Sequence, residues 1–152
     1  MTAIKPRSKK SGFTLIELLA VIVIAGIIAL VSLPVYNSIK PRLSLNAETR
    51  DIASDLRYAQ QSSVTEQVNY SVVFNQAQNN YAIVNTATGQ TVKNKDINQA
   101  ISIQSIADLT SDTVTFNVTG AALESGSITL VNAENLTSII SIKPSGYVKI
   151  EQ

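Results

Sequence analysis

The apolar residues of the chain are concentrated in one block near its N-terminus. From 13 to 33 the sequence reads FTLIELLAVIVIAGIIALVSL, in which Glu17 is the only ionisable residue. These 21 positions would span roughly 31 Å as a helix at about 1.5 Å per residue, close to the roughly 30 Å hydrocarbon thickness of a bilayer. The segment 13–34 is therefore predicted to be a transmembrane helix.

A second segment with helical spacing follows, from 35 to about 66. Its recurring positions are Leu45, Ile52, Leu56, Ala59 and Ser63, and the residues off that line are Glu48, Arg50, Asp51, Asp55 and Arg57. This pattern predicts a soluble amphipathic helix whose apolar stripe needs a partner surface. Pro34 and Pro41 each remove a backbone N–H, so bends are expected at both.

The remainder, 67–152, changes to short runs that alternate with period two or are rich in β-branched residues. The predicted strands are 70–74, 81–85, 100–106, 113–118, 127–131, 137–142 and 147–150, separated by Asn, Gly and Pro turn signals. Antiparallel sheets with one face covered fit this pattern. The fold class is thus predicted to be α+β, a long N-terminal helix packed on a β-rich globular head.

Charge is distributed unevenly along the chain. The segment 1–12 contains Lys5, Arg7, Lys9 and Lys10 and no acid, so the positive-inside rule places the N-terminus in the cytoplasm and the head outside it. Without those residues eight Lys and Arg remain against eleven Asp and Glu, a net side-chain charge of −3. This mild acidity argues against a nucleic-acid partner.

The absence of two residue types excludes several chemistries. The chain has no cysteine and no histidine, which rules out disulfides, thiolate nucleophiles, imidazole-based zinc sites and Ser-His-Asp catalysis. No carboxylate pair or Ser/Lys motif stands in their place, so neither an enzyme nor a cofactor is expected. The loop residues Asp108, Asp112, Asn117 and Glu124 offer oxygen atoms, but their spacing matches no calcium loop and solvated loop acids are favoured.

Glu17 is the unusual residue of the apolar block. A carboxylate at that depth costs about 2.5–3.5 kcal/mol on insertion scales and so wants a functional partner. A secretory signal peptide does not accommodate an acid within its apolar core, and a generic anchor leaves the glutamate unexplained. A cut after Gly12 would make Phe13 the first residue and create an α-amine one turn before Glu17, at the helix end that favours a negative charge.

The run Gly12-Phe13-Thr14-Leu15-Ile16-Glu17 resembles the processing site of type IV pilins and of type II secretion pseudopilins. The resemblance implies that 1–12 is a leader removed by a prepilin peptidase, which then methylates the amine of Phe13. It also implies that Glu17 pairs with the N-terminal amine of a neighbouring subunit during assembly, and that Pro34 marks a helix bend. Other pilins or pseudopilins and an inner-membrane assembly platform would be the partners.

The head is similar to the GspH/FimT group of minor pseudopilins and pilins. Segments of the head suggest it: Leu56-Arg57-Tyr58-Ala59, the strand at 70–74, and the closing pattern of 139–142 followed by Gly146-Tyr147-Val148. The function expected is a structural subunit of the inner membrane, with a periplasmic head, that joins or initiates a secretion pseudopilus or a type IV pilus. The alternative is a minor pilin whose head binds DNA or a surface.

Overall fold

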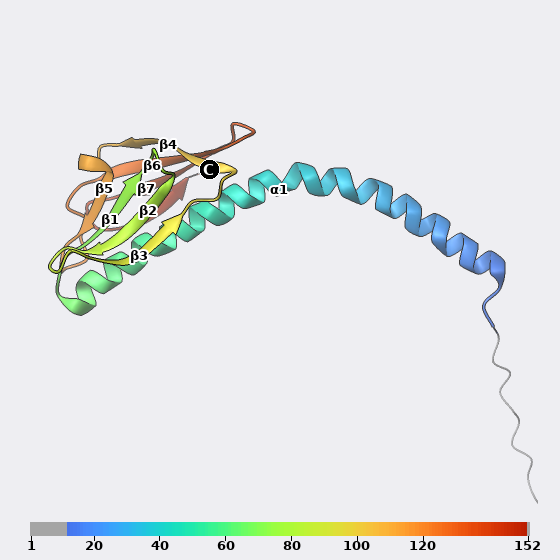
Figure 1. The fold of residues 1–152 in the computed structure, drawn as a ribbon, viewed down its shortest axis with the longest axis horizontal. Helices are drawn as coiled ribbons and strands as arrows, with labels where there is room; N and C mark the ends of the chain where they lie inside the picture. Colours follow the sequence, from blue (N-terminus) through green and yellow to red (C-terminus); the bar gives the residue numbers. More distant parts are fainter. Residues whose placement is uncertain (1–11, 152) are drawn as a thin grey trace, which may run out of the picture. The chain divides into compact units, whose positions relative to one another are not determined.

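One helix runs through both compact units of the chain. The computed structural model describes residues 12–151, and at 31–35 and 37 only the backbone is described. The units meet between Ser38 and Ile39. Helix α1 (Leu15–Glu66) begins in the first and ends in the second, without interruption at Pro34 or Pro41 (Figure 1).

The bends expected at these prolines stay predictions. The leader 1–12 lies almost wholly outside the described residues. Within the described part of the chain, no helix meets the length and hydropathy required to cross a membrane.

The second unit contains two antiparallel sheets. The strands are β1 (Tyr70–Asn75), β2 (Asn80–Asn85), β3 (Gln90–Asp96), β4 (Ile101–Ala107), β5 (Thr113–Phe116), β6 (Gly126–Asn132), β7 (Thr137–Ile142) and β8 (Val148–Glu151). Sheet A has the order β3-β2-β1-β5 and sheet B the order β4-β6-β7-β8. The predicted α+β class, a long helix followed by an antiparallel β-rich head, is confirmed.

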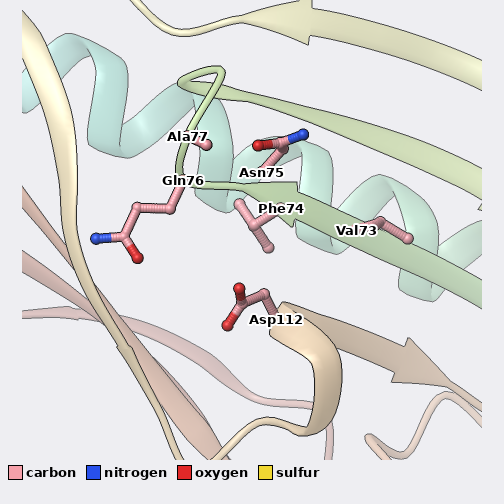
Figure 2. Close-up of a pocket in the computed structure, with 6 residues that line it drawn as sticks. All are labelled: Val73, Phe74, Asn75, Gln76, Ala77 and Asp112. Atoms are coloured by element: carbon pink, nitrogen blue, oxygen red, sulfur yellow. The ribbon is translucent and has the colours of Figure 1, made fainter.

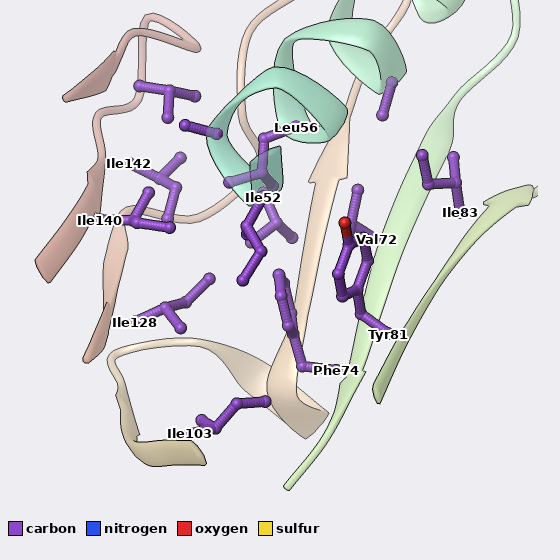
Figure 3. Packing of buried hydrophobic residues seen from close by; sticks show 14 of the residues in the cluster. Ile52, Leu56, Val72, Phe74, Tyr81, Ile83, Ile103, Ile128, Ile140 and Ile142 are labelled. Atoms are coloured by element: carbon purple, nitrogen blue, oxygen red, sulfur yellow. The ribbon is translucent and has the colours of Figure 1, made fainter. Parts of the chain in front are cut away.

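The core lies between the two sheets and the second half of α1. All five stripe positions of the helix are buried: Leu45, Ile52, Leu56, Ala59 and Ser63. Figure 3 shows Ile52 and Leu56 between Ile140 of β7 on one side and Val72 of β1 on the other. Burying each such Leu or Ile contributes about 1.5–3 kcal/mol relative to leaving it exposed, so the stripe holds the helix against the head.

The β1–β2 turn connects the two sheets. The Asn79 amide donates to the carbonyl of Ile101 at 2.7 Å, and its oxygen accepts the N–H of Ile103 at 3.2 Å. The Gln76 amide donates to the carbonyls of Ile103 and Gln104 at 3.1 and 3.0 Å. These side chains occupy the outer edge of β4, whose backbone groups have no neighbouring strand there.

Two features differ from the sequence prediction. Strand β3 was not predicted, because Val92 is its only apolar residue and six of its seven positions are exposed. Strand β5 ends at Phe116 rather than 118, because the Asn117 side-chain oxygen accepts the N–H groups of Thr119 and Ala121 and folds the chain into a turn.

Candidate functional site

The start of α1 is closed by two neighbouring side chains. Thr14 precedes the helix, and its hydroxyl oxygen accepts the backbone N–H of Glu17 at 3.3 Å. In return, Oε2 of Glu17 accepts the Thr14 backbone N–H at 3.0 Å and the Thr14 hydroxyl at 2.9 Å. This reciprocal pattern is a capping box, which satisfies N–H groups that no helical carbonyl reaches. The sequence prediction did not include Thr14, although the Thr-x-x-Glu spacing before an apolar run is the signal for it.

One oxygen of Glu17 remains available. Both hydrogen bonds from Thr14 go to Oε2, and no described residue donates to Oε1. The Glu17 side chain is exposed, and its neighbours in the first turn, Leu15 and Ile16, are 80% and 75% exposed. The cap therefore holds the carboxylate at the helix start through Oε2 and leaves Oε1 without a hydrogen bond from the described residues.

The expected cut site lies directly before this cap. Gly12 and Phe13 are outside the helix and exposed, and no atom lies within 4 Å of where a Gly12 side chain would begin. The Gly12–Phe13 bond is thus free of helical hydrogen bonding. The structure thus places Glu17 in the first turn of α1 and the predicted cut site, Gly12 and Phe13, just before that turn. The side chain of Pro34 is outside what the structure describes.

A second cluster of charges joins α1 to sheet A. Asp55 accepts the Tyr81 hydroxyl at 2.6 Å and the Lys93 ammonium at 2.7 Å, and Lys95 pairs with Asp51 at 2.8 Å. Burial, followed by the hydrogen bond to Asp55, raises the pKa of Tyr81 far above its usual range. The sequence pattern placed Asp55 off the buried stripe, but it is 7% exposed because these two donors compensate it.

Glu48 of α1 interacts electrostatically with Lys95 and Asp51 of the same cluster. Its Oε1 atom is buried and has no hydrogen-bond partner among the described residues. Burial raises the pKa of Glu48, and the positive charge of Lys95 and a hydrogen bond from the backbone of Asn98 oppose this rise. The cluster therefore connects α1 to sheet A and includes one carboxylate, that of Glu48, with a buried oxygen that accepts no hydrogen bond from the described residues.

Two of the four loop residues considered for calcium are engaged within their own loops. Glu124 accepts the backbone N–H of Thr110 at 2.7 Å and its hydroxyl at 2.8 Å, which holds the pKa of Glu124 below its usual value. Asn117 is engaged in its own turn. Among the described residues, no three acidic side chains are grouped closely enough to hold a metal ion.

Comparison with known families separates the chain into two matching parts. Residues 7–33 match the prokaryotic N-terminal methylation motif, and residues 48–146 match the model described as type II transport protein GspH. The second match covers more than half of the chain. The chain belongs to the GspH family. This confirms the expected group of minor pilins and pseudopilins, whose members are structural subunits.

Solved structures agree on the fold of this GspH-family chain. The minor pilin FimU of Pseudomonas aeruginosa aligns with a TM-score of 0.60 and 14% identity, covering 73% of this chain and 90% of FimU. The minor pseudopilin EpsH of Vibrio cholerae aligns with a TM-score of 0.60 and 5% identity, covering 71% and 96% of the respective chains. A search of curated proteins finds no significant match.

Proposed function

We propose that this GspH-family subunit is inserted in the inner membrane through 13–34 and joins or initiates a periplasmic filament, a secretion pseudopilus or a type IV pilus. The observation that carries the proposal is the capped carboxylate of Glu17 directly after an exposed, non-helical Gly12–Phe13 bond. The match of 7–33 to the methylation motif supports the same reading. The N-terminus lies in the cytoplasm and the head in the periplasm.

Processing prepares the helix end for assembly. A prepilin peptidase cleaves after Gly12 and methylates the amine of Phe13. Thr14 keeps its N–H and hydroxyl after the cut, so the cap on Glu17 is compatible with the processed chain. The leader, with its four cations, orients the uncut chain with its N-terminus in the cytoplasm.

Assembly uses the free oxygen of Glu17. The Phe13 amine of a neighbouring subunit binds at Oε1, while Thr14 holds Oε2. A carboxylate in hydrocarbon is stabilised by a cation and by hydrogen bonds, and this arrangement supplies both. The membrane assembly platform brings the two helices together.

A head that binds DNA is not favoured. The only cationic side chains in 67–151 are four lysines. Lys93, Lys95 and Lys149 are paired with carboxylates, which leaves Lys143 outside the ion pairs of the described residues. A phosphate backbone requires several clustered free cations. Aromatic side chains can stack on bases. Among four tyrosines of the chain, however, Tyr70 and Tyr81 are buried, and only Tyr58 and Tyr147 are exposed.

Intact-mass analysis of the chain recovered from membranes tests processing. Cells with a prepilin peptidase are expected to yield a chain that lacks 1–12 and carries one methyl group, and cells without it an uncut chain. Glu17→Gln keeps the shape and one acceptor but removes the charge, so it should be processed yet fail to enter filaments. An uncut wild-type chain, or a Glu17→Gln chain that assembles normally, would refute the proposal.

A further inference from the structure

A shallow, largely open cleft lies between the β1–β2 turn and the short 3-10 helix η1 (Thr110–Asp112). It has a volume of about 580 Å³ and is lined by Val73, Phe74, Asn75, Gln76, Ala77 and Asp112. Figure 2 shows the Asp112 carboxylate directed from η1 toward the strand that carries Phe74, with Gln76 at the other side of the opening. All six lining residues belong to the second unit.

The polar atoms still available in the cleft are acceptors. The Gln76 amide nitrogen is used on the edge of β4, which leaves its Oε1. Both polar atoms of Asn75 are engaged with Gln78, at 3.2 and 3.0 Å. Within the part of the chain that the structure describes, the half-buried Asp112 carboxylate has neither an ion pair nor a hydrogen bond. These acceptors favour a ligand that donates hydrogen bonds and carries positive charge.

The backbone that carries Asp112 lies in a strained turn. Ser111 and Asp112 have φ values of 53° and 52°, the left-handed region that non-glycine residues rarely adopt. Glu124 holds the start of this turn through the two hydrogen bonds it accepts from Thr110. Backbone strain of this kind clusters at ligand clamps and other functional sites, which supports a ligand site beside Asp112.

We propose that this cleft receives an arginine or lysine side chain from the head of a neighbouring filament subunit. The cation pairs with Asp112 and donates to Oε1 of Gln76, while its aliphatic stem packs on Val73, Phe74 and Ala77. The charge complementarity selects a basic side chain over an acidic or purely apolar one. The identity of the partner as a subunit rests on the proposed function, which brings heads into contact.

The chemistry is tested with N-acetyl-arginine amide as a probe, titrated into the full chain in detergent micelles and followed by the backbone amide shifts of 73–77. N-acetyl-citrulline amide is the matched neutral control. We expect the arginine probe to bind about tenfold more tightly than citrulline, the ratio expected of one charge-assisted hydrogen bond. Equal shifts with both probes, or none with either, would overturn the proposal.

Two matched variants locate the effect. Asp112→Asn removes the charge and is expected to weaken the arginine probe about tenfold. Asp108→Asn is the control, because Asp108 is an exposed acid in the same loop with a similar φ of 59°. Asparagine tolerates that region, so neither change adds strain. Equal weakening in both variants would show a general loop charge effect and refute the site.

The partner is tested by photo-crosslinking in cells, with a benzophenone amino acid in place of Val73. The expected product joins this position to another filament subunit beside an arginine or lysine, and disappears in the Asp112→Asn background. A link to an exported protein would refute the subunit as occupant, and a link that persists in that background would refute the pairing with Asp112. Failure of processing at Gly12 is read from the chain mass and leaves the probe titration unaffected, so the two proposals fail separately.

Discussion

At the scale of single residues, Gly146 shows how tightly the turns close on α1. Its φ is +79°, and a side chain there would overlap the carbonyl oxygen of Gly120 and the amide of Gln60. Gly89 has a φ of +69° but open space around it. We expect Gly89→Ala to cost about 1 kcal/mol, from the left-handed backbone alone, and Gly146→Ala about 3 kcal/mol or more. Urea unfolding of both variants measures the difference, and equal costs would show that the Gly120 contact is unimportant.

The ionisation of a single residue, Glu48, makes the folding stability of the chain depend on pH. Burial raises its pKa in the folded state above the ordinary value of 4.5. Its contribution to stability is therefore complete below 4.5 and is lost as the pH rises through the higher folded-state pKa. We expect Glu48→Gln to gain stability relative to wild type between about pH 4 and pH 7, since glutamine does not ionise.

Unfolding free energies measured across that pH range test the Glu48 prediction. Glu134→Gln is the control because Glu134 is an exposed glutamate at the β6–β7 turn. A difference between wild type and Glu48→Gln that does not change with pH would contradict the assignment.

At the scale of elements, Asp55 of α1 contacts both β2 and β3. Its side chain is 10% exposed and accepts from Tyr81 and Lys93. The side chain of Asp51 is 62% exposed, and among the described residues its one ion pair is with Lys95. We expect Asp55→Ala to cost about 2 kcal/mol, because it leaves the Tyr81 hydroxyl buried without an acceptor. Asp51→Ala should cost less than about 1 kcal/mol. Comparable losses in urea unfolding would contradict this difference in roles.

Some elements could be predicted from the local sequence and others could not. The stripe of α1 was predictable because helical spacing identifies a buried face whatever covers it. Strand β3 was not predictable, because it has no apolar face. Its lysines Lys93 and Lys95 form ion pairs with acids of α1 that lie 38 and 44 positions away in the sequence, and local patterns do not reveal such pairs. Asp55 was misplaced for the same reason, since its burial follows from partners that local spacing does not reveal.

At the scale of the whole molecule, the sequence was more informative about the family than about the geometry of the site. The motif from Gly12 to Glu17 predicted the family that the comparisons confirm. The cap between Thr14 and Glu17 joins residues three positions apart, so the Thr-x-x-Glu motif predicts it from the sequence alone. The cleft at Asp112 could not be foreseen, because it forms where β1 and η1 meet, more than 30 positions apart.

The division into two units predicts that the head folds without the first part of the helix. The buried apolar core of the described residues begins at Leu45, and none of it comes from 12–38. A chain beginning at Ile39 should therefore unfold cooperatively in urea with the midpoint of the full chain, since it loses no core contact. A chain beginning at Ala53 lacks Leu45 and Ile52 and should show no cooperative transition, because each such loss costs about 2–5 kcal/mol of a stability of about 5–15 kcal/mol. A lower midpoint for the longer chain would mean that residues before Ile39 stabilise the head.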